Sequence, residues 1–158
     1  MDDERAQARN PTDLPLSVEV VHLIDRANNE SARHDHEYIG TEHLVLALTQ
    51  QDAPAEPLRA LGIEPQRVYS KIDETIRRGT ATVASSAERA ERPFTSRTKQ
   101  AFSFAAGVAQ ELGHARIEVP HLLVGLMRER LNIGAQVLAD QGLTEERAFE
   151  LARDGSRL

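Results

Sequence analysis

The sequence predicts an all-α protein in which two related four-helix repeats pack about a pseudo-twofold axis into one domain. Apolar residues recur at the spacing of an α-helix in eight segments. Helix-capping residues stand before several of these segments. The second half of the chain aligns with the first at an offset of 78 residues in its early part, and the later landmarks need about two more residues in the second copy. Aromatic residues make up only 4% of the 158 residues, so the expected core is aliphatic, as in packed helices.

Four helices are predicted in the first half. Ser and Thr are favoured as N-caps, Pro in the first turn and Gly just after the last. The expected helices are one capped by Ser17 that runs to about Arg33, one capped by Thr41, a short one bounded by Pro54 and Pro57 that ends near Leu61-Gly62, and one from Pro65 to Gly79.

The pattern then restarts. The second half is expected to hold a long helix opened by Phe94-Thr95, a helix begun by Pro120, a helix capped by Asn132 and closed by Gly142, and a last helix capped by Thr144. Leu16-Ser17 aligns with Phe94-Thr95, and Ile39–Leu44 aligns with Ile117–Leu122. Because each repeat needs a neighbour to bury its apolar face, the two copies should share one core.

The expected boundaries follow from composition. A break rich in small polar and charged residues separates the copies and is expected to act as a linker. The predicted organisation is a disordered lead-in at 1–15, a first repeat at 16–79, a linker at 80–93, a second repeat at 94–154 and a tail at 155–158.

Composition excludes several classes of function. The formal net charge of −6 argues against nucleic acid as the main partner, because phosphate binding needs a basic surface. The absence of Cys excludes disulfides, thiolate metal sites and thiol nucleophiles. No apolar run approaches the ~20 residues that span a bilayer. The chain is therefore expected to be cytoplasmic, with no membrane partner and no cofactor.

Four strings carry a family resemblance. Tyr38–Leu48, Phe94–Lys99, His121–Leu126 and Gly134–Leu138 resemble successive segments of the Clp N-terminal repeat domain, which precedes the ATPase rings of ClpC- and ClpA-type unfoldases. The resemblance covers about residues 16–151. It implies a non-catalytic module of the Clp protease system, whose partners are Clp unfoldase or protease components, protein substrates, adaptors and cyclic peptides.

Three functional hypotheses remain open at this point. Nothing in the chain reads Gly-x-x-x-x-Gly-Lys-Ser/Thr, so no ATP phosphate loop is expected. The favoured hypothesis is a stand-alone double-repeat protein that binds substrates, adaptors or peptides. The alternatives are an N-terminal fragment of a ClpC-type ATP-dependent unfoldase and a small metal-dependent hydrolase.

Glu42 is the first candidate site residue. In ClpC-type domains the Glu of this string helps to bind phosphorylated arginine, so the resemblance implies that Glu42 pairs with the guanidinium. Ser17 and Thr41 stand at predicted helix starts, where hydroxyls and amides can hold the phosphate. The second copy has Pro120 in place of the carboxylate, although Thr95 remains, so one site per chain is expected. The competing interpretation is that Glu42 only stabilises a helix start.

Phe94 and Thr95 form a second candidate. In mycobacterial ClpC-type domains the aromatic residue that matches Phe94 belongs to a pocket for cyclic peptide antibiotics. The corresponding hypothesis is that Phe94 is partly exposed as a hydrophobic anchor, with Thr95 as the cap of its helix. The competing interpretation is that Phe94 packs in the core or staples the linker to the helix.

The His-rich turn invites a metal hypothesis, which the sequence does not favour. His34, Asp35, His36 and Glu37 are consecutive, and His43 follows closely. Such residues ligate zinc, but four consecutive residues have no fixed helical register. His43 matches His121 in the second copy, so a structural role at the repeat seam is expected and no metal is predicted.

Overall fold

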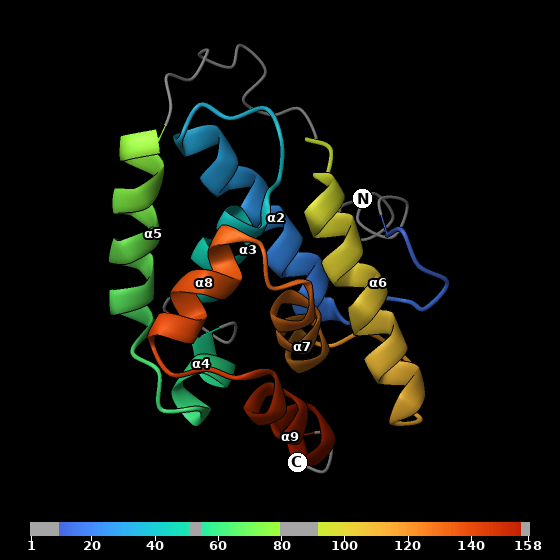
Figure 1. Cartoon of the computed structure of the whole chain (residues 1–158). Coiled ribbons are helices and arrows are strands. Elements are labelled where there is room, and N and C mark those ends of the chain that lie inside the picture. The colour runs from blue at the N-terminus through green and yellow to red at the C-terminus, as the bar shows by residue number, and fades with distance from the viewer. Residues whose placement is uncertain (1–9, 51–54, 80–91, 156–158) are drawn as a thin grey trace.

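The structure of the chain is a computed structural model that describes residues 10–50, 55–79 and 92–155. These residues form eight helices and, apart from two isolated bridges, no strand. Figure 1 shows their arrangement. The helices are α2 (Val18–Arg33), α3 (Thr41–Leu48), α4 (Glu56–Ala60), α5 (Pro65–Gly79), α6 (Ser96–Glu111), α7 (Val119–Glu129), α8 (Ile133–Asp140) and α9 (Glu145–Gly155). The predicted all-α class of two four-helix repeats is confirmed.

The predicted side-chain caps are present at four helix starts, including that of α9, where the Thr144 Oγ1 accepts a hydrogen bond from the Arg147 amide at 3.1 Å. The Ser17 Oγ accepts a hydrogen bond from the Val20 amide at 3.2 Å, and the Thr95 Oγ1 accepts one from the Thr98 amide at 3.2 Å. Asn132 caps α8 through its Oδ1, which accepts from the Ala135 amide at 2.6 Å. Each bond satisfies an amide that has no carbonyl partner within its helix.

The predicted cap of α3 was wrong by one residue. Gly40 is the N-cap and Thr41 is the first helical residue. The side chain that closes this turn belongs to His43, whose Nδ1 accepts the Gly40 amide at 2.9 Å. In α7 the same bond joins the Glu118 amide to Nδ1 of His121, also at 2.9 Å. An imidazole therefore fixes both starts, and Thr41 is free of the capping role.

The two repeats are joined by reciprocal backbone pairing. Leu16 forms a parallel bridge with Ile117, and Phe94 forms one with Ile39. The Ser17 amide donates to the Ile117 carbonyl at 2.9 Å, and the Thr95 amide donates to the Ile39 carbonyl at 3.1 Å. Both pairs obey the 78-residue offset, so the first strand-like residue of each repeat binds the segment before the second helix of the other.

One core serves both repeats. A single cluster of buried apolar side chains contains residues from α2 through α9. Helix α8 of the second repeat packs on α3 and α5 of the first. Gly134 permits this close approach, since a Cβ there would lie 2.6 Å from the Val45 side chain and 3.1 Å from the Thr41 carbonyl. The start of α8 is thereby placed beside the start of α3.

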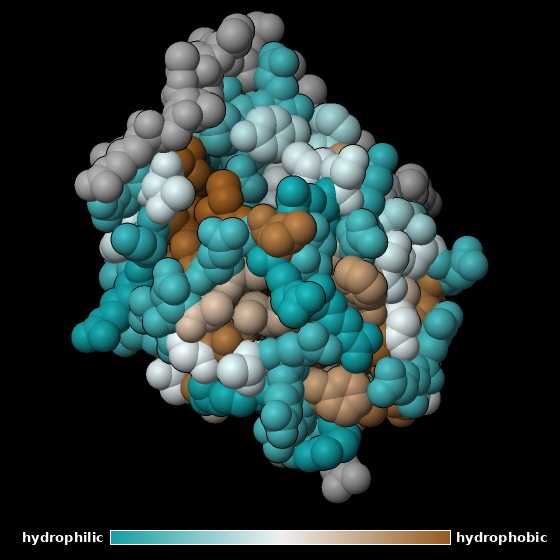
Figure 2. Space-filling view, in the orientation of Figure 1, coloured by the Kyte–Doolittle hydropathy of each residue, from teal (hydrophilic) through white to brown (hydrophobic). Residues whose placement is uncertain are grey.

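The face seen in Figure 2 is mostly hydrophilic, as expected when the aliphatic residues are buried in the core. Hydrophobic side chains reach this face in small patches between helices. One such patch lies near the N-terminal end of α8. None of the described helices is long and apolar enough to cross a membrane.

The predicted domain boundaries stay a prediction. Residues 1–9 of the expected lead-in, 80–91 of the linker and 156–158 of the tail lie outside the described residues. At the end of the lead-in, the Pro15 carbonyl accepts a hydrogen bond from the Ile117 amide at 2.9 Å, so this residue already takes part in the fold.

Replacement of Gly125 by Ala should destabilise the crossing of α6 and α7. A Cβ at Gly125 would lie 2.1 Å from the Ala101 carbonyl oxygen and 3.1 Å from the Ala105 amide, which are backbone atoms that cannot move aside alone. We expect a loss of about 1–3 kcal/mol in the free energy of unfolding by urea. Gly107→Ala is the matched control, because its Cβ would meet nothing within 4 Å and alanine is the better helix former. Equal stabilities of the two variants would contradict the tight crossing.

Candidate functional site

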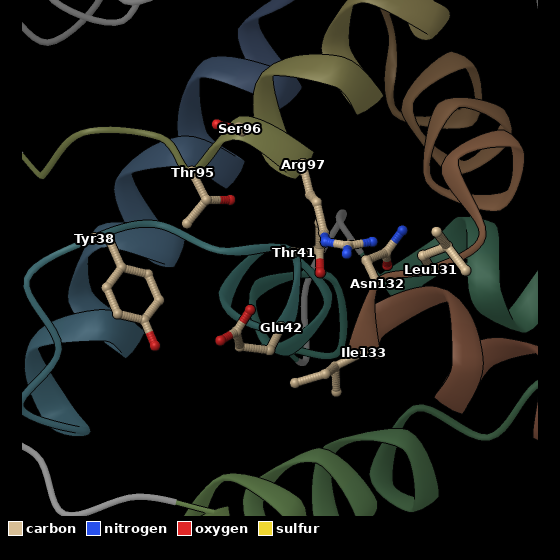
Figure 3. Close-up of a pocket in the computed structure, with 9 residues that line it drawn as sticks. All are labelled: Tyr38, Thr41, Glu42, Thr95, Ser96, Arg97, Leu131, Asn132 and Ile133. Carbon is tan, nitrogen blue, oxygen red and sulfur yellow. The ribbon is translucent and has the colours of Figure 1, made fainter.

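A pocket of about 480 Å³ lies where the two repeats meet. Figure 3 shows its lining. Residues from the first repeat surround the start of α3, and residues from the second repeat belong to the start of α6 and to the turn between α7 and α8. The lining residues are Tyr38, Thr41, Glu42, Thr95, Ser96, Arg97, Leu131, Asn132 and Ile133.

Three helix N-termini converge on this pocket. Thr41, Ser96 and Ile133 are the first residues of α3, α6 and α8, and all three line it. The first amides of a helix have no carbonyl partner inside the helix, and the helix dipole adds partial positive charge there. The guanidinium of Arg97 lies at the same place, where it is paired with the Glu129 carboxylate. The helix starts therefore favour an anionic group at this end of the pocket.

Glu42 supplies the opposite charge. Burial raises the pKa of its carboxyl group above the ordinary value, while its own backbone amide and the Tyr38 hydroxyl oppose that shift. The carboxylate curls back over Gly40, where a Cβ would lie 2.2 Å from the Glu42 Oε1. Glycine thus leaves the space that this orientation needs. A cation bound beside Glu42 would favour its ionised form.

Glu129 organises the opposite wall. Its Oε2 accepts a hydrogen bond from the Arg97 guanidinium at 3.2 Å. Its Oε1 accepts from the Leu131 amide at 3.1 Å and from the Asn132 side-chain amide at 3.0 Å. One carboxylate thus orients both the cation of the pocket and the turn that carries Leu131.

The structure brings together three of the five predicted site residues. Thr41, Glu42 and Thr95 all line the pocket. Ser17 does not, because it is 2% exposed and caps α2 at the pseudo-twofold-related junction.

Phe94 is also absent from the lining, and the hypothesis that its ring is partly exposed was wrong. The ring is 7% exposed and stacks on Phe102 with centroids 5.2 Å apart. The physical reason is the backbone bridge between Phe94 and Ile39, which draws the residue inward between the repeats.

The second repeat lacks an equivalent charge arrangement. The offset aligns Glu42 with Pro120 and Arg97 with Glu19, so the carboxylate is lost and the cation becomes an anion. Glu118 occupies the position of Gly40, which is consistent with the absence of a carboxylate that needs the space. The sequence difference between the copies therefore gives two unlike junctions.

A hydrogen-bonded histidine pair lies beside each junction. His43 Nε2 lies 2.7 Å from His36 Nδ1, and His121 Nε2 lies 2.7 Å from His114 Nδ1. Because a backbone amide donates to Nδ1 of His43, the proton of the neutral ring must be on Nε2, which donates to His36. Burial is the main reason that the pKa of His43 falls to about 3 and that of His121 to about 4.

His36, Glu42 and His43 could hold a metal by proximity, since their ligand atoms lie within 4.8 Å of one another. The protonation pattern disfavours it. A metal on His43 Nε2 would require the proton to move to Nδ1, where the Gly40 amide already donates. His114 and His121 repeat the arrangement at a junction whose Pro120 offers no carboxylate. The expected structural role of the histidines fits this geometry, and the prediction of no metal stays a prediction.

The family is established by comparison with known proteins. A family model for the Clp repeat (R) N-terminal domain matches residues 15–141. The chain therefore belongs to the Clp repeat N-terminal domain family. It is 32% identical over 129 residues to the chloroplastic chaperone protein ClpC1 of Arabidopsis thaliana, which covers 80% of this chain and 13% of that protein. A ClpA homolog of Guillardia theta is 32% identical over 130 residues, covering 81% of this chain and 15% of its own length.

Solved structures share the fold. The N-terminal domain of ClpD from Arabidopsis thaliana matches with a TM-score of 0.64 and 18% identity, covering 90% of this chain and 95% of that one. The N-domain of ClpV from Vibrio cholerae matches with a TM-score of 0.69 and 13% identity, covering 96% and 87%. The chain thus spans nearly all of these separate N-domains, but only a small part of the full-length relatives.

Sequence reasoning missed part of the lining, namely Tyr38, Ser96, Arg97, Leu131, Asn132 and Ile133 as site residues. Their common signal is position, because they lie at or next to the starts of α3, α6 and α8. The partnership of Arg97 with Glu129 has no local signal, since 32 residues separate them.

Proposed function

We propose that this domain is a non-catalytic protein-binding module of a Clp protease system, which recognises protein substrates or adaptors through a phosphoarginine side chain in the pocket between the repeats. The observation that carries the proposal is the combination of one carboxylate, Glu42, with three helix N-termini in the same pocket. Phosphoarginine has the matching chemistry, because a cationic guanidinium is bonded directly to an anionic phosphate.

Each end of such a side chain has a partner. Glu42 can accept hydrogen bonds from the guanidinium, and charge-assisted bonds of this kind are strong. The amides at the start of α6, the hydroxyl of Ser96 and the Arg97 guanidinium can hold the phosphate. An unmodified arginine would leave the amides at the start of α6 without an anionic partner, so the pocket should discriminate against it.

Replacement of Glu42 by Gln should weaken phosphoarginine binding roughly ten- to a hundredfold, because a charge-assisted pair typically contributes about 1.5–3 kcal/mol. The measurement is titration calorimetry with a short phosphoarginine peptide, and the expected stoichiometry is one peptide per chain. Glu19→Gln is the matched control, because it neutralises a carboxylate at the related start of α2 without touching the pocket. Two equivalent sites, or equal affinities of Glu42→Gln and the unchanged domain, would refute the assignment.

The same module would serve either of two contexts. As a stand-alone protein it would compete with an unfoldase for partners, and as the N-terminal part of a ClpC-type unfoldase it would deliver them to the ATPase. The pocket chemistry is the same in both. The histidine cluster disfavours the hydrolase alternative, since His43 accepts the Gly40 amide at Nδ1 and donates from Nε2 to His36.

A further inference from the structure

Exposed apolar side chains are concentrated at this pocket. Among the described residues only three large apolar side chains are exposed, namely Val18, Leu131 and Ile133, and the last two line the pocket. Leu131 is 70% exposed and Ile133 is 38% exposed. Figure 3 shows both on the side of the pocket away from Tyr38. Neither of these two exposed apolar side chains is needed to bind a charged group.

The turn that carries Leu131 is held in place by several hydrogen bonds. Arg130 adopts a left-handed backbone conformation with φ of 65°, which is unfavourable for a residue other than glycine. The Leu131 amide donates to the Glu129 carbonyl at 2.7 Å and to the Glu129 Oε1 at 3.1 Å. The neighbouring Asn132 side chain donates to the Leu126 carbonyl at 3.1 Å. These bonds fix the backbone of the turn from which the exposed Leu131 side chain extends.

The same carboxylate orients Leu131 and the charged wall. Glu129 bonds both the Leu131 amide and the Arg97 guanidinium. Glu129 therefore fixes the position of the Leu131 backbone relative to the Arg97 guanidinium. A protein segment whose charged side chain enters the pocket would bring its neighbouring residue onto this rim.

The geometry points to Leu131 and Ile133 as specificity-determining residues. They would select protein segments in which a large apolar residue stands next to the phosphoarginine. The inference rests on the proposed function and adds the sequence context that the site prefers. Its occupant is an extended protein segment with phosphoarginine beside Leu, Ile or Phe. Contact between such a residue and the rim would remove apolar surface from water and so add to the affinity.

The test compares two short peptides with a central phosphoarginine, one flanked by leucines and one by serines, together with free phosphoarginine. We expect the leucine peptide to bind the unchanged domain about five- to tenfold more tightly. Leu131→Ser should remove most of that preference and leave the affinity for free phosphoarginine unchanged. Val18→Ser is the matched control, because it removes a similarly exposed apolar side chain outside the pocket. Urea unfolding of both variants checks that stability is retained.

The possible outcomes distinguish a failure of the apolar rim from a failure of phosphoarginine binding. Equal binding of both peptides would overturn the specificity of the rim and leave the charged site intact. A preference that survives in Leu131→Ser would place the apolar contact elsewhere and likewise overturn the inference. Failure of free phosphoarginine and both peptides to bind the unchanged domain would overturn the proposed function and the rim together.

Discussion

Replacement of Phe94 by Ala is expected to lower the free energy of unfolding by about 3–5 kcal/mol. The ring is 7% exposed, and it stacks on Phe102 at an interplanar angle of 3°. Its removal would leave a cavity between the first and second repeats, at the point where Phe94 also pairs with Ile39. The surrounding backbone is fixed by that pairing and cannot collapse to fill the space.

Urea unfolding followed by circular dichroism measures this loss. Val18→Ala is a suitable control, because Val18 is 59% exposed and should change stability by less than about 0.5 kcal/mol. A Phe94→Ala domain as stable as the control would contradict the burial of the ring. It would also restore the idea of an exposed aromatic anchor for peptides.

The second large effect is a loss of stability between pH 7 and pH 5, caused by His43 and His121. In the folded domain their pKa values are about 3 and about 4, against a reference of 6.5. Burial is the first cause for both, followed by the partner rings His36 and His114, and for His43 also by His34 and Arg92. The unfolded chain therefore binds protons that the folded domain does not.

This difference in bound protons decides the direction in which stability changes with pH. Stability is fully present above about pH 6.5 and falls as the pH is lowered toward the folded pKa values, because protonation favours the unfolded chain. The expected loss between pH 7 and pH 5 is about 2 kcal/mol for each histidine.

Urea unfolding at pH 7, 6 and 5 measures this dependence, and His121→Gln should remove the part that His121 contributes. Burial also lowers the pKa of His36, so this ring adds to the dependence in the same direction. Most carboxylates titrate below this range, so they add little to it. A free energy of unfolding that does not change between pH 7 and pH 5 would show that the two rings are not held neutral.

Much of the fold was predictable because its signals are local. Ser17, Thr95 and Asn132 cap helices through bonds that span three residues, and such caps are visible in the sequence. Gly62 and Gly142 have φ values of 77° and 100°, which is why glycine marks these helix ends. The repeat offset predicted the pseudo-twofold relation without any knowledge of packing.

The candidate site was less predictable because its contacts are distant. Glu42 and Thr95 were expected at helix starts, but only the pairing of Thr95 with Ile39 explains why they line one pocket. Phe94 follows a polar segment, so its sequence surroundings suggested exposure, whereas its burial depends on Ile39 of the other repeat. No local pattern could have indicated that Glu129 holds both Arg97 and the Leu131 turn.

The reciprocal bridges have a consequence for how the chain can fold. Leu16 and Ile39 each need a backbone partner from the second repeat, and Phe94 and Ile117 need one from the first. A repeat produced alone would expose unsatisfied amides and carbonyls together with half of an apolar core. Native contacts between residues so far apart in sequence are slow to close, so the two halves should become structured together in one cooperative step. A polypeptide with a single such repeat would have to meet a second copy of itself to complete the same interface.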